Sequence, residues 1–383
     1  MRRLIKIEEL GRIITGSTPP TNKSEYFGKD YLFIKPSDIN KESRITYNTE
    51  TKISEAGAEV FKTISIPKGS TCVVCIGSIG EKLTYTNCLV FTNQQINSII
   101  PNVHFDNKYV FYLIKNNLYK LKAANQGSSS GRENVSKRTF GNIVVEIEDS
   151  IVHQKKISSI LSAYDDLIEN NQKQIKLLEE AAQRLYKEWF VDLRFPGYEN
   201  VKIVDGVPEG WSNIKIDDMF QFKYGKNIST SVISNKGKYA VYGANGRIGY
   251  YNEKNCDDYV VLVTSRGNGS GDVMRTHEKN SFVTNNSFIV KPYDSSIGIS
   301  FVYQLMKYSN FKSICSGSAQ PQLTNNAIRL LSVLFPERHL IYAYCKYADK
   351  CISAIDQLLM KNDLLKEARD RLLPKLMSGE IEV

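Results

Sequence analysis

The sequence has few of the residues that build metal centres and disulfide frameworks. Only seven cysteines and four histidines occur among its 383 residues. Cys72 and Cys75 form one close pair, but no second pair stands at the spacing of a zinc site. The histidines, at positions 104, 153, 277 and 339, share no motif with each other or with the cysteines. This pattern argues against a disulfide framework and predicts a reduced, cytoplasmic protein without a metal site.

Long apolar runs are also missing. The first twelve residues carry charges with no apolar run behind them, and no stretch reaches the roughly 18 apolar residues of a membrane span. We therefore expect no targeting segment and no membrane partner.

No convincing catalytic set is present either. The segment Arg266–Gly271 (RGNGSG) is rich in glycine, but it lacks the helix and the distal acid of a nucleotide site. A flexible loop is therefore favoured over the phosphate-binding loop of an enzyme. The chain also lacks a clear carboxylate cluster of a metal nuclease and the proline-rich Asn/Asp signature of amino-methyltransferases. We predict a chain that is inert alone and needs no cofactor.

What the sequence does have is positive charge. Its formal net charge is +9, and its isoelectric point is near 9.0. A nucleic-acid partner is one interpretation of this charge, and a solvated basic surface is the other. The 22 tyrosines suit wet interfaces and base stacking, but they suit ordinary β-sheet cores equally well.

Two stretches predict unusually long helices with apolar seams. In the first, from Ile151 to Asp192, seam residues step by four and three without Pro or Gly, and about forty residues make a rod of about 60 Å. The second, between Ala348 and Leu376, repeats the stepping, although Arg369 interrupts the seam and Pro374 is expected to end or kink the helix. The predicted packing residues are Ile157, Leu161, Ile168, Asn171, Ile175 and Leu178 in the first helix, and Ile355, Leu358, Asn362, Leu365 and Leu372 in the second.

The two helices resemble each other in sequence. Ser162–Asp165 (SAYD) matches Ser353–Asp356 (SAID), and Asn171 and Asn362 stand at the same offset. Polar seam residues cost stability but fix register, so we predict that the two asparagines lie close together across the helix pair. The alternative is that each faces solvent where the seam drifts.

The remainder of the chain predicts two related mixed domains. Short β-branched and aromatic runs with Pro and Gly between them fill residues 1 to 150, with a helix expected from Asp106 to Lys122. The later region repeats this framework loosely, Gly225 aligning with Gly16 and Thr284 with Thr92. We predict an α/β (α+β) fold in which two similar globular domains are separated by two long antiparallel helices, a coiled-coil spacer with a pseudo-two-fold internal repeat. The expected boundaries are 1–150, 151–195, 196–338 and 339–383.

Five motifs, in this order, resemble the specificity subunit of type I restriction–modification enzymes. The resemblance spans essentially the whole chain, except that residues 336–342 lack an evident counterpart of Gln154. The motifs are Gly16–Pro20 (GSTPP) with Tyr26–Gly28 (YFG), Gln154–Ile157 (QKKI), Val207–Trp211 (VPEGW), Gly317–Thr324 (GSAQPQLT) and Leu372–Gly379 (LLPKLMSG).

The resemblance implies a role in reading DNA. Both globular domains would be target recognition domains, each reading one half of a bipartite site in double-stranded DNA. The helices would hold the halves apart and dock two adenine methyltransferase subunits, and restriction subunits would join for cleavage. Two alternatives stay open: a recognition module of another restriction or methylation system, and a coiled-coil adaptor that binds no DNA.

Candidate base contacts are basic and amide side chains in the predicted loops. Arginine pairs with guanine, and asparagine or glutamine with adenine, in the major groove. Each candidate could instead contact a phosphate or lie solvated in its loop. The candidates are Lys82, Gln94, Gln95, Arg132 and Arg138 in the first domain, and Arg247, Arg266, Asn268, Arg275, Gln320 and Gln322 in the second.

Overall fold

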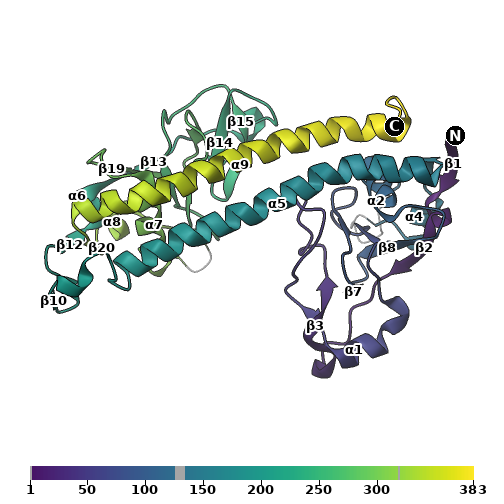
Figure 1. Cartoon of the computed structure of the whole chain (residues 1–383), viewed down its shortest axis with the longest axis horizontal. Helices are drawn as coiled ribbons and strands as arrows, with labels where there is room; N and C mark the ends of the chain where they lie inside the picture. The colour runs from purple at the N-terminus through teal and green to yellow at the C-terminus, as the bar shows by residue number, and fades with distance from the viewer. Residues whose placement is uncertain (1, 126–133, 318–319) are drawn as a thin grey trace. The chain divides into compact units, whose positions relative to one another are not determined.

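The computed structural model describes residues 2–125, 134–317 and 320–383. It divides into two compact units: unit 1 contains Met1–Asn171 and Lys361–Val383, and unit 2 contains Gln172–Met360. Each unit combines β-sheets with a segment of each long helix, α5 (Ile151–Phe190) and α9 (Arg338–Ser378) (Figure 1). In that described part of the chain, no helix has the length and hydropathy needed to cross a membrane.

The described residues of unit 1 form three sheets. An antiparallel sheet has the order β2-β8-β5-β6, a smaller sheet has the order β4-β3-β7 with β3 and β7 parallel, and β1 pairs with β9. The strands are β1 (Arg2–Lys6), β2 (Gly11–Thr15), β3 (Phe27–Ile34), β4 (Lys52–Ile53), β5 (Thr71–Val74), β6 (Leu83–Tyr85), β7 (Val90–Thr92), β8 (Ile96–Pro101) and β9 (Val144–Glu148).

Unit 2 repeats this topology strand for strand. The antiparallel sheet is β13-β19-β16-β17, the smaller sheet is β15-β14-β18 with β14 and β18 parallel, and β12 pairs with β20. A short hairpin, β10-β11, precedes them. The strands are β10 (Ile203–Val204), β11 (Val207–Pro208), β12 (Ser212–Lys215), β13 (Phe220–Tyr224), β14 (Tyr239–Gly243), β15 (Gly246–Tyr251), β16 (Val261–Thr264), β17 (Val273–Arg275), β18 (Phe282–Val283), β19 (Ser287–Pro292) and β20 (Ser332–Phe335).

Two glycines show why the repeat keeps certain residues. Gly16 follows β2, and a Cβ atom there would lie 2.1 Å from the Thr92 carbonyl oxygen. Gly225 follows β13, and a Cβ atom there would lie 2.3 Å from the Thr284 carbonyl oxygen. Only glycine permits this close approach of two chain segments. The predicted alignment of these four positions, and with it the internal repeat, is confirmed.

Each unit builds its core between the antiparallel sheet and one amphipathic helix. In unit 1, α2 (Asn107–Asn116) buries six consecutive residues, and these belong to one core with residues of the sheet, Ile157 of α5 and Leu376 of α9. In unit 2, α7 (Ile299–Tyr308) packs with Tyr186 of α5 and Tyr344 of α9. The shorter helices are α1 (Glu55–Val60), α3 (Leu118–Ala123), α4 (Lys137–Asn142), α6 (Ile216–Met219) and α8 (Asn325–Ile328).

The single helix predicted from Asp106 to Lys122 is in fact two helices. Asn117 separates α2 from α3 and adopts a non-helical conformation. Its side-chain Nδ2 donates to the Leu113 carbonyl oxygen at 2.8 Å. That oxygen is the acceptor that a continuing helix would offer to the backbone of residue 117, so the side chain competes with the helix.

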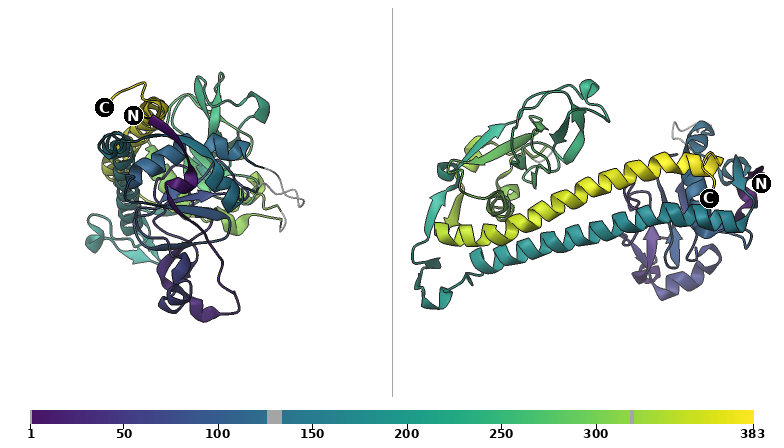
Figure 2. Two further views of the ribbon diagram at one scale, coloured as in Figure 1. Left: turned by 90° about the vertical axis from the view of Figure 1, so that its right-hand side faces the viewer. Right: turned by 45° about the horizontal axis from the view of Figure 1, so that its top comes forward.

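The long helices pack against each other within each unit. In unit 1, Asp165 of α5 contacts Arg369 of α9, and Asn171 of α5 contacts Asn362 of α9. The two helices therefore run antiparallel (Figure 2). In unit 2, the Tyr344 hydroxyl of α9 donates to the Ala182 carbonyl oxygen of α5 at 3.1 Å. The predicted fold class, mixed α and β with a duplicated domain and two long antiparallel helices, is confirmed.

Of the two outcomes predicted for Pro374, an end or a kink of its helix, the end is wrong. Helix α9 continues through it to Ser378, and Pro374 itself is exposed. Its neighbours Leu373, Leu376 and Met377 are buried in the core of unit 1. The burial of these side chains outweighs the lost backbone hydrogen bond, because packing of an apolar face contributes more to helix stability than propensity does.

Candidate nucleic-acid interface

Three loops of unit 2 meet and form one surface. They are the β14–β15 turn (residues 243–246), the glycine-rich loop after β16 (265–271) and the segment before α8 (315–324). Thr264 Oγ1 donates to the Ala244 carbonyl oxygen at 2.8 Å. The Gly267 amide and the Ser270 hydroxyl both donate to the Pro321 carbonyl oxygen, at 3.1 and 2.6 Å. We call these loops, in the residues that the structure describes, the three-loop surface.

The glycine-rich loop is a tight turn that backbone hydrogen bonds close, and the flexibility predicted from its composition stays a prediction. The Gly271 amide donates to the Thr264 carbonyl oxygen at 2.8 Å, which closes the loop. Gly267 and Gly271 have positive φ angles of 87° and 86°. At Gly271 a Cβ atom would also lie 2.7 Å from the Lys312 amide nitrogen. The glycines therefore serve backbone geometry and close packing, and they hold the neighbouring side chains in place.

Most of the predicted contacts of the second domain lie on or beside this surface. Arg266, Asn268 and Gln320 are exposed, and the backbone of Arg266 pairs with that of half-buried Gln322. Arg247, at the start of β15, lies 3.2 Å from Glu278 and stacks over the Tyr250 ring at 5.4 Å. Five of the six predicted residues are thus brought together.

Arg275 is the exception, and its position corrects the prediction. Its side chain is only 4% exposed, and Nη1 and Nη2 donate to the Asp356 carboxylate at 2.9 and 2.7 Å. A guanidinium held in this way has no free edge to offer a guanine base. Arg275 joins β17 to α9, and we remove it from the proposed base contacts.

The candidates of the first domain lie on several loops of unit 1. Gln94 is exposed and accepts a hydrogen bond from the Thr18 hydroxyl at 2.7 Å, while Gln95 Oε1 accepts from Asn93 Nδ2 at 2.9 Å. Lys82 Nζ donates to the Pro36 carbonyl oxygen at 2.7 Å. Arg138 is exposed on α4, apart from these loops in sequence, and Arg132 lies outside the described residues.

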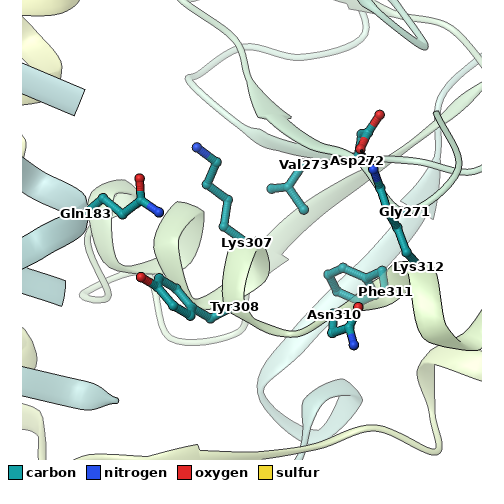
Figure 3. A pocket seen from close by; sticks show the side chains of 9 residues that line it. All are labelled: Gln183, Gly271, Asp272, Val273, Lys307, Tyr308, Asn310, Phe311 and Lys312. Carbon is teal, nitrogen blue, oxygen red and sulfur yellow. Dashed lines mark ion pairs between the residues drawn. The ribbon is translucent and has the colours of Figure 1, made fainter. Parts of the chain in front are cut away.

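A groove of about 370 Å³ opens beside the glycine-rich loop of unit 2. Figure 3 shows the amine of Lys307 extending from α7 into it. Lys312 Nζ pairs with Asp272 at 2.6 Å. In the described part of the chain, by contrast, no carboxylate lies within ion-pair distance of Lys307, whose Nζ lies 4.9 Å from the Tyr303 ring centroid. Lys307 therefore offers a positive charge to an anion next to the three-loop surface.

Cys72 and Cys75, the close pair of the sequence, are both buried. Burial raises the pKa of Cys72 to about 12 and that of Cys75 to about 11. Thiols with such pKa values stay protonated near neutral pH and are poor nucleophiles. Among the described residues, no group of three or more His, Cys, Asp or Glu side chains has the arrangement of a metal site.

Comparison with known proteins gives the chain a family. Residues 3–180 and 208–361 match the profile of the type I restriction modification DNA specificity domain. The chain belongs to this family of type I specificity subunits. The match occurs twice, once in each half, as the duplicated topology requires. Membership gives the chain a role in DNA recognition.

Individual relatives support the family along nearly the full length. The chain is similar to the type I restriction enzyme MjaIX specificity subunit of Methanocaldococcus jannaschii, with 27% identity over 99% of this chain and 93% of the relative. It is also similar to the HindI specificity subunit of Haemophilus influenzae, with 33% identity over 40% of this chain and 34% of the relative. The crystal structure of a type I restriction–modification S subunit from Mycoplasma genitalium shares the fold, with a TM-score of 0.59, 18% identity and coverage of 98% and 96%.

The seam residues of this type I specificity chain lie as follows. Nδ2 of Asn171 donates to Oδ1 of Asn362 at 2.8 Å, and both side chains are buried. In unit 1, Ile157, Leu161 and Ile168 are buried, and Leu365 and Leu372 are half-buried. In unit 2, Ile355 is buried, and Ile175, Leu178 and Leu358 are half-buried.

Sequence reasoning missed a set of buried charges on the same helices of the specificity chain. In unit 1, Asp165 contacts Arg369 and accepts a hydrogen bond from the Tyr112 hydroxyl at 2.5 Å. Burial, together with the Asp165 charge, raises the pKa of Tyr112 far above its ordinary value. In unit 2, Asp356 accepts from Arg275 and lies 2.9 Å from His277 Nδ1. The only sequence signal was the equal spacing of Asp165 and Asp356.

Proposed function

We propose that this chain is the non-catalytic specificity subunit of a type I restriction–modification complex and that it reads a bipartite site in double-stranded DNA. The observation that carries the proposal is one framework with two different sets of loop side chains. The backbone of Arg266 pairs with Gln322 in unit 2, whereas at the equivalent place in unit 1 Ile76 pairs with Asn134. Equivalent loops with different side chains suit two different half-sites.

The proposed base contacts are the polar loop residues of each unit. A guanidinium binds the O6 and N7 atoms of guanine, and a carboxamide binds the N6 and N7 atoms of adenine. Lys307 is proposed as a phosphate contact, because its amine is exposed beside the loops and carries no ion pair among the described residues. The proposed base contacts are Lys82, Gln94, Gln95 and Arg138 in unit 1 and Arg247, Arg266, Asn268, Gln320 and Gln322 in unit 2.

The proposed partners are two adenine methyltransferase subunits, which dock on the long helices, and restriction subunits, which join for cleavage. Several large apolar side chains on these helices are exposed. They are Leu167 at 45% and Leu364 at 61% in unit 1, and Leu177 at 65%, Tyr347 at 57% and Met360 at 66% in unit 2. Apolar side chains along a helix are buried at low cost by a partner protein. Because α5 and α9 each continue through both units, we propose that they also set the spacing of the half-sites.

The test is to co-express the chain with its methyltransferase subunits, purify the complex and map methylated adenines across a genome. We expect one motif with two defined halves and a fixed undefined spacer. Arg266→Ala should relax the half read by unit 2 and leave the other half unchanged, with Arg329→Ala, an exposed arginine paired with Asp217, as the matched control. A continuous motif without a spacer, or a stable complex that methylates no adenine, would refute the proposal.

A further inference from the structure

A segment without regular structure joins the sheets of unit 1 to helix α5. Residues 35–51, here called the strap, connect β3 to β4. The strap places Arg44 against α5, where Nη2 lies 2.5 Å from Asp166 and Nε lies 3.2 Å from Glu169. The Arg44 side chain is only 6% exposed. Beside it, the Tyr47 hydroxyl donates to Glu169 at 2.8 Å. An arginine from one segment thus holds two carboxylates of another.

The strap also makes hydrogen bonds to the sheets of unit 1. The Tyr85 amide of β6 donates to the Arg44 carbonyl oxygen at 2.9 Å, and the Thr46 amide donates to Thr84 Oγ1 at 3.0 Å. The Pro36 carbonyl oxygen, at the start of the strap, accepts from Lys82 Nζ. Arg44 is therefore linked through the strap to β6 and to Lys82, which lies in the loop just before β6.

Unit 2 has no strap but has a different arginine at the helix. There the β14–β15 connection consists of Ala244 and Asn245 only. Instead, Arg275 at the end of β17 makes two hydrogen bonds to Asp356 of α9, and His277 reaches the same carboxylate. The strand β17 begins directly after the glycine-rich loop, so three residues separate Arg275 from the three-loop surface.

We propose that Arg44 and Arg275 are positioning residues, each of which sets the orientation of the base-reading loops on the helical part of its own unit and thereby governs recognition of one half-site. This inference rests on the proposed function of the loops. Arginine suits the role because its planar fork holds two acceptors in a defined geometry, which a lysine amine does not. Removing it leaves a largely buried carboxylate, Glu169 in unit 1 or Asp356 in unit 2, without its arginine, and the segment that carried the arginine must then move.

The experiment uses the complex with its methyltransferase subunits and compares methylation motifs of Arg44→Lys, Arg44→Ala, Arg275→Lys and Arg275→Ala. Each arginine is the matched control for the other. We expect the Arg44 variants to discriminate the correct base from a wrong one about tenfold less well, which is the effect of losing one good base contact. This loss should occur only in the half-site read by unit 1. The Arg275 variants should show the same loss in the other half only. Lys62→Ala, which removes an exposed lysine paired with Glu59, should change neither half.

The outcomes separate this inference from the proposed function. If the wild-type complex yields no bipartite motif, the proposed function fails and the inference fails with it. If the wild-type motif is bipartite but each variant relaxes both halves equally, or neither, only the positioning roles are refuted. Should the alanine variants not fold, the positioning roles are tested by Arg44→Lys, Arg275→Lys and Tyr47→Phe. Tyr47→Phe removes a half-exposed hydroxyl from the Glu169 contact and is expected to relax the same half as Arg44→Lys.

Discussion

At the scale of single residues, the duplicated helices show how one ancestral position can acquire different partners. Asp165 and Asp356 stand at equivalent places, and both are largely buried and charge-paired. Asp165 is paired by an arginine of the second long helix, whereas Asp356 is paired by an arginine of a β-strand. The two equivalent carboxylates take their cations from different segments, because a buried charge requires a partner but does not specify which segment supplies it.

The buried asparagine pair leads to a prediction about stability and register. Asn171→Leu alone should destabilise the chain by about 1–3 kcal/mol, because it leaves the Asn362 amide buried without a partner. The double change Asn171→Leu with Asn362→Leu should recover that stability, since two apolar residues pack in a seam. Denaturant titration of the single and double variants measures both effects.

The same double variant tests the role of the pair in register. A seam without its polar contact is expected to tolerate more than one alignment, so the methylation motif should show more than one spacer length. Gln174→Leu, at an exposed position of α5, is the control. A double variant whose motif keeps a single, unchanged spacer would show that the asparagines do not set the register.

At the scale of elements, the repeat is maintained by close contacts between strands and turns. Gly16 and Gly225 are the clearest cases, since a Cβ atom at either position would overlap a carbonyl oxygen. Helix α9 shows the opposite relation: its local sequence contains a proline that favours a break, yet the helix continues because its last turns are buried. Packing elsewhere cannot compensate for a Cβ atom that overlaps backbone atoms, whereas it can compensate for a residue of low helix propensity.

Alanine substitution at the glycines gives the second prediction. Gly16→Ala and Gly225→Ala should each destabilise their own unit by several kcal/mol, because the new Cβ atom would meet backbone at 2.1 and 2.3 Å. Gly269→Ala should have little effect, since the nearest atoms are side-chain ends at 3.1 and 3.2 Å. Thermal unfolding compared across the three variants measures this. Equal melting temperatures for all three would contradict the assignment of close contacts.

At the scale of the whole molecule, the net charge of +9 favours binding to the DNA that the loops of the two units are proposed to read. Contacts to phosphates release counter-ions, so the affinity of the assembled complex for duplex should fall steeply as salt rises. Lys307→Ala should weaken binding to all sequences alike and reduce the slope of log affinity against log salt by about one. Titrations of target and non-target duplex between low and moderate salt measure this slope.

The control for this prediction is Arg329→Ala, which also removes one exposed positive charge from unit 2 but takes it from an existing pair with Asp217. It should leave the slope nearly unchanged. A salt-independent affinity, or an equal change of slope in both variants, would argue that Lys307 contacts no phosphate. A complex that binds no duplex at all would favour the coiled-coil adaptor.

The sequence by itself determined the features that depend on neighbours along the chain. The stepping of apolar residues in the long helices is such a local pattern. Its repeat, with Asn171 and Asn362 at the same offset and Gly16 and Gly225 at matching positions, could also be read from the sequence. The candidate base contacts of the second domain were chosen on similar grounds, as polar residues between predicted strands, and they stay a prediction.

Only the tertiary structure decided which charges meet. Arg44 and Arg275 reach carboxylates that lie 122 and 81 residues away, and no local pattern distinguishes a buried arginine from an exposed one. The same holds for the glycine-rich loop, in which Gly267 and Ser270 donate hydrogen bonds to the distant Pro321 carbonyl oxygen. Periodicity is a property of a segment, whereas the partner of a charge is chosen by the packing of distant segments, and that packing separates a base contact from a structural ion pair.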